Sequence, residues 1–311
     1  MPDAASCFYV TNEKGEAAAK TYTVLDVEAV PVEETGKTDD DCIKSFILDR
    51  APQIIETDVA IAGGGMGGVA AALALGPETR AIVTEETSWL GGQLSAQGVC
   101  ALDENKYIET TGACHNYLQF RQAIRKAYRD TGNLTEAAAA DPLLNPGACW
   151  VTRLAFEPQV ALPLLDAMLA PLTKSGALTI KKRTKVVDVA LEEGSAKIKA
   201  LLAVDLDNGI FSEIHCASVI DATELGDLMP LAKVPYSTGS DSRWVTGEAF
   251  APESPDAENV QDFTYPFVLD YYDGENHTIE KPSDYEAFLS AGKFSFDSYK
   301  MFREHDDDST G

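Results

Sequence analysis

The sequence has few of the residues that build metal centres. It contains only 4 histidines and 6 cysteines among 311 residues. None of these stands in a CxxC pair or in the cysteine–histidine spacing of a zinc site. We therefore expect no metal site. Scattered cysteines without a pairing pattern are typical of reduced thiols, so we expect a cytoplasmic protein.

Positive charge is scarce as well. The chain carries 25 basic against 50 acidic residues, which gives a net charge of −25 at pH 7. Such a surface repels nucleic acid and anionic membranes, and we expect neither as a partner. The acidity fits a salt-rich habitat or simply a well-solvated surface, and charge alone does not separate the two.

Long apolar runs are also missing. The most apolar stretch, residues 160–172, is interrupted by Pro163, Asp166 and Pro171 and is too short to cross a membrane. The N-terminus has neither the basic region nor the apolar region of a secretory signal. The 45% of residues that are hydrophobic suffice for one large or two modest cores.

The first strong local pattern begins at residue 57. The run TDVAIAG predicts a buried parallel strand, and RAIVTEE predicts a second one. Between them, MGGVAAALALG predicts a helix of small residues that ends at Gly76 and Pro77. Strand, helix and strand in this order form a βαβ unit.

The turn between the first strand and the helix carries a GxGxxG motif. Gly63 permits the tight turn, Gly65 lets the backbone approach a pyrophosphate, and Gly68 lets the helix pack close to the sheet. Met66 and Gly67 lie at the helix N-terminus, whose free N–H groups attract phosphates. A glycine-rich turn without a ligand is the alternative, but the strand–helix–strand context favours a bound dinucleotide.

Two further features indicate which dinucleotide binds. Glu85 and Glu86 end the second strand, where an acid accepts hydrogen bonds from an adenosine ribose, and strand alternation favours Glu85. A second glycine pair, Gly91 and Gly92, is followed by Gln93 and permits backbone passage beside a ligand. An NAD domain has no general need for this pair, so the spacing favours FAD. Taken alone, the pair could be a simple turn.

Residues 177–222 predict a cluster of strands. Turns at EEGS and LDNG separate the strands of a three-stranded β-meander, which precedes a final buried strand ending in VIDAT. A meander inserted before a last strand is typical of one kind of FAD domain.

Four segments occur in order: TDVAIAGGGMGG, EETSWLGGQLSAQG, CWVTRLAFEP and VIDATELGDLMPLA. Together they resemble glutathione-reductase-like FAD-dependent oxidoreductases, a family that also contains heterodisulfide-reductase A-like flavoproteins. The resemblance covers residues 57 to about 248. It implies an α/β fold: a Rossmann-type FAD-binding domain with a parallel sheet and the inserted meander, plus the start of a second domain. It also implies FAD and redox chemistry, without naming a substrate.

The resemblance further implies that the last strand of the domain returns to the FAD. In related proteins this strand ends in Ala-Thr-Gly, whereas here Glu224 follows Thr223. The cofactor contacts that we expect in the meander and after the last strand are Val186, Ala222, Thr223, Gly226 and Asp227.

We expect three parts in the chain. These are an acidic N-terminal extension at 1–50 with a strand-like run at 21–32, an FAD-binding domain at 51–245, and an incomplete substrate or cap domain at 246–311. The family closes its cofactor site with a distant glycine-rich segment, which residues 232–311 do not contain. We therefore expect a fragment of a longer enzyme, or a second chain that completes the site. A reduced flavodomain that is whole as it stands is the alternative.

Catalytic groups are weakly marked. His115, beside Cys114, could donate a proton or attach the flavin. Arg153 could bind an anion. A structural role is the alternative for both residues.

Two clusters of positive charge stand out in this acidic chain. Residues 115–130 predict an amphipathic helix with a basic stripe of Arg121, Arg125 and Arg129. The run KKRTK at 181–185 predicts the exposed edge of a strand.

These features favour an FAD-dependent oxidoreductase that passes a hydride or electrons between a small organic substrate and bound FAD. One alternative is a flavin-binding or electron-transfer subunit without its own substrate site, which the lack of a convincing catalytic cluster favours. Another is an NAD(P)-dependent dehydrogenase, which the order of the WLGGQ and DATELGD segments disfavours.

Overall fold

The computed structural model describes residues 6–15, 17–29, 39–99, 101–149, 151–261 and 272–289. Contacts divide the chain into two compact units, Met1–Pro266 and Phe267–Gly311. The described part of the second unit contains the short helix α8 (Tyr285–Leu289).

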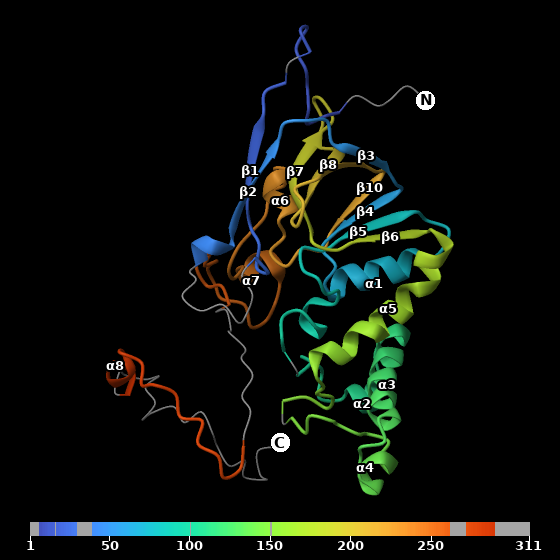
Figure 1. Cartoon of the computed structure of the whole chain (residues 1–311), viewed down its shortest axis with the longest axis vertical. Coiled ribbons are helices and arrows are strands. Elements are labelled where there is room, and N and C mark those ends of the chain that lie inside the picture. The colour runs from blue at the N-terminus through green and yellow to red at the C-terminus, as the bar shows by residue number, and fades with distance from the viewer. Residues whose placement is uncertain are drawn as a thin grey trace. The chain divides into compact units, whose positions relative to one another are not determined.

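A four-stranded parallel sheet forms the centre of this unit, in the order β10-β4-β5-β6. Its strands are β4 (Val59–Ala62), β5 (Ala81–Thr84), β6 (Leu178–Lys181) and β10 (Ser218–Asp221). Helices α1 (Met66–Leu75) and α5 (Pro158–Ser175) cover one face (Figure 1). The predicted βαβ unit is therefore confirmed. The last strand, β10, is only partly buried because it lies at the edge of the sheet.

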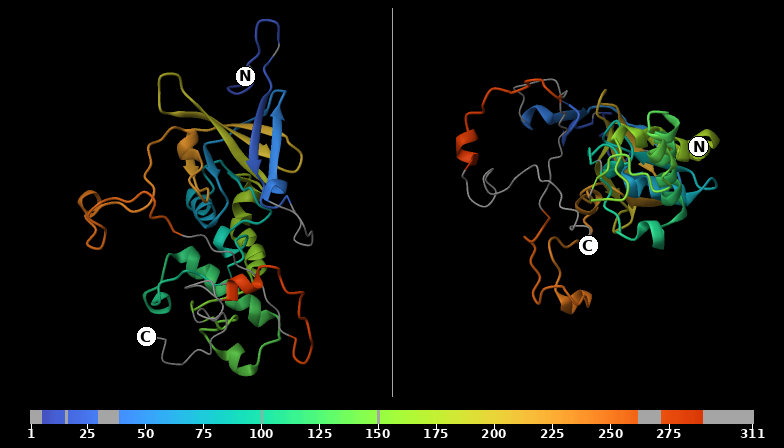
Figure 2. Two further views of the ribbon diagram at one scale, coloured as in Figure 1. Left: turned by 90° about the vertical axis from the view of Figure 1, so that its left-hand side faces the viewer. Right: turned by 90° about the horizontal axis from the view of Figure 1, so that it is seen from below.

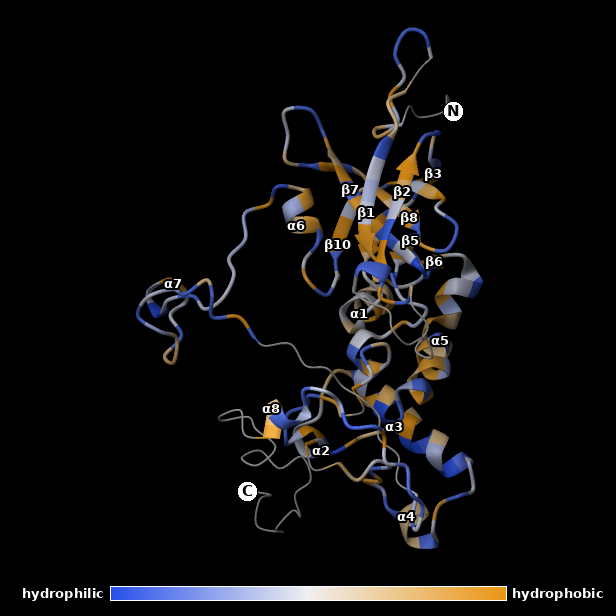
Figure 3. Ribbon diagram, turned by 60° about the vertical axis from the view of Figure 1, so that its left-hand side comes forward, coloured by the Kyte–Doolittle hydropathy of each residue, from blue (hydrophilic) through white to orange (hydrophobic). Residues whose placement is uncertain are grey.

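The opposite face of the parallel sheet packs on a second sheet, in the order β3-β9-β8-β7. Its strands are β3 (Gln53–Glu56), β7 (Thr184–Leu191), β8 (Ile198–Asp205) and β9 (Phe211–His215). Strands β7, β8 and β9 form the predicted antiparallel meander, and β3 joins parallel to β9. Successive residues of β4 point to opposite faces, so Ile61 contacts the helical layer while Ala60 and Ala62 contact the meander. Figure 3 shows apolar stretches along β7 and β10, one strand from each sheet.

A helical layer continues beyond α5. The predicted helix at 115–130 is confirmed as α3 (His115–Asp130), which packs against α5. The short helices α2 (Ile108–Thr111) and α4 (Glu136–Ala140) flank it. Helix α5 begins at Pro158, and Pro163 and Pro171 lie inside it. The remaining short elements are η1 (Asp39–Cys42), η2 (Gly92–Leu94), α6 (Leu228–Leu231) and α7 (Arg243–Thr246). Within the described residues, no helix combines the length and apolarity that crossing a membrane requires.

The N-terminal arm, as we call residues 17–29 and 39–48, is an antiparallel pair of strands. They are β1 (Lys20–Leu25) and β2 (Ile43–Leu48). The arm packs on the meander (Figures 1 and 2), where Tyr22 and Val24 are buried with Leu202 and Phe211. The strand expected at 21–32 thus ends at Leu25 in the structure, and β2 was not predicted.

The basic stripe expected on α3 is wrong for two of its three arginines, because Arg121 and Arg125 are buried. Arg121 forms ion pairs with Glu104 and Glu109, and Arg125 pairs with the same Glu109. Arg125 also donates from Nε to the backbone oxygen of Leu144 at 3.0 Å. Buried charges are tolerated here because each one has a partner.

We predict that Arg121→Met lowers the free energy of unfolding by about 3–5 kcal/mol, since it leaves Glu104 buried without its cation. The measurement is urea unfolding followed by circular dichroism. Lys126→Met is the matched control, because Lys126 forms an exposed pair with Asp130 on the same helix and should cost less than about 1 kcal/mol. Equal effects of the two substitutions would contradict the prediction.

Candidate functional site

The glycine motif follows β4 at a point where three backbones converge. Gly63 has φ +94° and donates its N–H to Thr84 O at 2.9 Å. A Cβ on Gly63 would overlap the backbone oxygen of Ala222 at the end of β10, and a Cβ on Gly68 would overlap the backbone oxygen of Gly63. These two glycines therefore allow β4, α1 and the segment after β10 to come together.

Two other glycines face one another across a narrow space. Gly65 caps the N-terminus of α1, and a Cβ added to Gly92 would lie 3.1 Å from Gly65 Cα. The turn that carries Gly92 is fixed because Gly91 donates its N–H to Gly64 O at 2.9 Å. The result is a space bounded by backbone, at the end of a helix where N–H groups favour an anion.

Two hollows lie beside this space. We call them together the groove, because they share part of their lining. The first is a cavity of about 200 Å³ whose lining includes Thr84, Glu85, Glu86, Lys185, Val186 and Asp227. The second is more open, and its lining includes Gly65, Met66, Gly67 and Gln93. Gln97, Ala222, Thr223 and Glu224 line both hollows.

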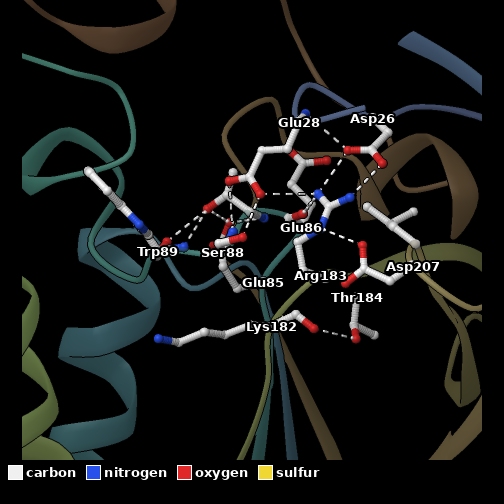
Figure 4. A network of polar contacts seen from close by, with 12 residues as sticks. Asp26, Glu28, Glu85, Glu86, Ser88, Trp89, Lys182, Arg183, Thr184 and Asp207 are labelled. Atoms are coloured by element: carbon white, nitrogen blue, oxygen red, sulfur yellow. Dashed lines mark hydrogen bonds and ion pairs between the residues drawn. The ribbon is translucent and has the colours of Figure 1, made fainter. Parts of the chain in front are cut away.

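The two acids after β5 have different partners. Glu85 is buried and accepts the N–H of Gly64 at 2.8 Å, while its other oxygen accepts the N–H and O–H of Thr87 at 2.7 and 2.8 Å. Glu86 forms an ion pair with Lys185 across the cavity. Glu85 thus joins the glycine loop to its own turn, whereas Glu86, which Figure 4 shows beside it, is engaged with Lys185.

Glu224 stands inside the glycine-lined space. A Cβ on Gly65 would lie 2.7 Å from Glu224 Oε1, and a Cβ on Gly92 would lie 2.8 Å from the same oxygen. Burial raises the pKa of Glu224, a hydrogen bond with Gln97 lowers it, and the charge of Glu85 raises it further. The side chain that replaces glycine in the expected Ala-Thr-Gly pattern therefore occupies the space that the glycines leave open.

The remaining expected residues divide into two groups. Gln93 lines the open hollow and donates from its amide to Asp103 Oδ2 at 3.3 Å. Gly226 has φ +70° and forms a turn before α6 without lining either hollow. His115 and Arg153 are exposed and also line neither hollow. The structure therefore does not bring these two catalytic candidates to the groove.

Some residues of the groove were not expected from the sequence. They are Val27, Thr87, Gln97, Thr184, Lys185 and Glu224. Glu224 had a sequence signal as a departure from the Ala-Thr-Gly pattern, and Lys185 was marked only as part of the basic run at 181–185. The expectation that residues 181–185 form an exposed strand edge is also wrong for two residues. Lys185 forms an ion pair with Glu86, and Arg183 forms one with Asp26.

Comparison with known families agrees with this geometry. The family described as FAD dependent oxidoreductase matches residues 58–307, and the chain belongs to it. The cofactor of the family is FAD, and a glycine-rich turn at the N-terminus of a helix such as α1 is where the pyrophosphate of a dinucleotide binds; here a ligand would have to displace the side chain of Glu224 from that space. The assignment favours FAD over the NAD(P)-dependent alternative.

Several solved structures are similar to the chain at low identity. The Mycobacterium smegmatis Sdh1 complex in the apo form has 16% identity and a TM-score of 0.36, over 55% of this chain and 34% of that one. Adenylylsulfate reductase from Archaeoglobus fulgidus has 17% identity and a TM-score of 0.36, over 56% and 31%. THI4 from Thermovibrio ammonificans has 17% identity and a TM-score of 0.35, over 66% and 77%. The matched part is about a third of the first two chains, and the likeness concerns the fold alone. No curated protein sequence matches.

We predict that Gly68→Ala destabilises the fold by about 1–3 kcal/mol. The added Cβ would clash with the backbone oxygen of Gly63, which cannot move without displacing the loop. Gly67→Ala is the control on the same helix turn. No atom lies within 4 Å of a Cβ on Gly67, and alanine favours a helix by up to about 1 kcal/mol over glycine. Thermal unfolding of both variants checks this. A Gly68→Ala protein as stable as the wild type would show that the helix can shift freely.

Proposed function

We propose that this chain provides the FAD-binding part of an oxidoreductase that passes a hydride or electrons between a small organic substrate and the flavin. The observation that carries the proposal is the pairing of Gly65 with Gly92 at the N-terminus of α1, beside a cavity that holds an acid at the end of β5. A pyrophosphate and a ribose need this combination.

In this proposal each part of the groove has a separate task. The backbone around Gly65 and Gly92 receives the pyrophosphate, and Glu85 accepts hydrogen bonds from the ribose while it holds Gly64. Ala222 and Thr223 pass beside the cofactor at the end of β10. Bound FAD supplies the redox chemistry, and the protein supplies its orientation and its electrostatic surroundings.

A non-catalytic flavin-binding or electron-transfer subunit is the second candidate. The observation that favours it is the position of His115 and Arg153, which are exposed and lie outside the groove lining. Turnover of a small substrate by the flavin-loaded chain would decide for the enzyme.

We further propose that residues 51–245 are the FAD-binding domain and that residues 246–311 belong to a substrate or cap domain.

The decisive experiment compares Gly65→Val with Gly67→Ala after refolding in excess FAD. Gly65→Val should fold, since its side chain meets the flexible end of Glu224. It should lose at least roughly fivefold in FAD affinity, because forced overpacking costs about 1–3 kcal/mol. Gly67→Ala should keep its flavin. Absorbance and flavin release by acid provide the measurement. A wild-type protein that takes up no FAD would refute the proposed function.

We also predict that Glu224 opposes the pyrophosphate. Below its raised pKa the side chain is neutral, and above that pKa its negative charge repels the phosphates. The FAD dissociation constant should therefore rise as pH rises through the pKa of Glu224. Glu224→Gln should remove this dependence and tighten FAD by roughly tenfold at alkaline pH, or about 1.4 kcal/mol. Fluorescence titrations with FAD at a series of pH values between about 5 and about 9 test this. An identical pH profile in the variant would refute it.

A further inference from the structure

The N-terminal arm lies outside residues 58–307, which match the family, yet it is firmly attached beside the groove. Tyr22 and Val24 of β1 are buried against Leu202 and Phe211 of the meander. Two polar attachments then fix the turn after β1, one through Asp26 and one through Glu28. The arm is therefore placed to contribute to the cofactor site itself.

Arg183 makes the first attachment, from the loop between β6 and β7 (Figure 4). Its Nη1 and Nη2 donate to the two carboxylate oxygens of Asp26 at 2.8 and 2.6 Å, and Nη1 also donates to Glu86 O at 2.9 Å. Lys44 adds a second ion pair to Asp26 at 2.7 Å. Burial would raise the pKa of Asp26, but hydrogen bonds from Arg183 and Lys44 outweigh it and lower the pKa to about 2. This attachment is thus fully charged at neutral pH.

Glu28 makes the second attachment. Its carboxylate accepts the N–H and the O–H of Ser88 at 2.8 and 2.6 Å. Ser88 belongs to the turn that Thr87 closes onto Glu85. The arm therefore holds the segment that presents both acids, Glu85 and Glu86, to the cavity.

Val27 lies between these two attachments. It lines the cavity together with Glu86, Lys185 and Val186, yet 56% of it remains exposed. The contacts of its neighbours Asp26 and Glu28 hold Val27 in place, while its own apolar surface stays in water. A ligand that covers this surface removes it from water, which favours binding. Val186, which is buried on β7, offers a second aliphatic surface to the same cavity.

We propose that the N-terminal arm forms one wall of the FAD site at its adenosine end, with Val27 and Val186 facing the adenine ring. The inference rests on the proposed function, because it takes the groove at Gly65 as the FAD site. Glu85 marks the ribose, and Val27 lines the same cavity as Glu85. Docking of the arm and binding of FAD then strengthen each other, because coupled equilibria are reciprocal.

The test measures the binding of FAD, and separately of ADP, to the full chain and its variants. Val27→Ala should raise both dissociation constants roughly fivefold through lost apolar contact. Val27→Asp should raise both more than roughly tenfold, since it places a charge beside Glu86 and against the apolar adenine ring. Ile43→Ala is the matched control, an exposed apolar residue on the same arm, and should change neither constant.

Limited proteolysis supplies an independent readout. Saturating FAD should slow cleavage within the arm of the wild type, and Arg183→Met should speed cleavage and weaken FAD. Unchanged binding of FAD and ADP by both Val27 variants, or a change for FAD alone, would overturn the inference while leaving the proposed function intact. Absence of protection by FAD would overturn it as well. A wild type that binds neither ligand would overturn the proposed function itself.

Discussion

The loop between β4 and α1 is enclosed by backbone, and the rest of the site depends on that contact. The carbonyl of Ala222 lies against Gly63, and the carbonyl of Gly63 lies against Gly68. Side chains can rotate away from a clash, but backbone within a sheet can do so only by moving whole strands. The position of the α1 N-terminus relative to the cavity is therefore set by main chain. Side chains such as Glu85 then secure it through hydrogen bonds to the loop.

The part of the fold that could be predicted from sequence is the part with local causes. A four-residue apolar run, a glycine turn and a helix of small residues determine β4 and α1 within a few positions. The meander was likewise marked by its turns. Strand β2 was missed because it is weakly buried, with exposed residues alternating with partly buried ones and only Leu48 fully buried. Its existence depends on pairing with β1 and on packing against the meander.

Charges were the hardest feature to predict. Arg121 lies on a helix face that looks solvent-facing from periodicity, but Glu104 approaches it from a segment with no helical relation to α3. Arg183 sits in a run of basic residues, and its partner Asp26 comes from more than 150 positions earlier in the chain. The departure at Glu224 was visible in the sequence, whereas the direction of its side chain was not. Long-range pairing, not local propensity, decides these positions.

The groove also constrains the order of events when the protein is made. Its lining runs from Val27 through Glu85 and Val186 to Asp227, so no early portion of the chain contains a complete binding surface. Chains fold as they emerge from the ribosome, N-terminal parts first. The first strand, its glycine turn and the arm must therefore wait for the segment after β10 to be synthesised. On the proposed assignment of the groove, flavin insertion is a late step in biogenesis, because the segment after β10 has to be synthesised first.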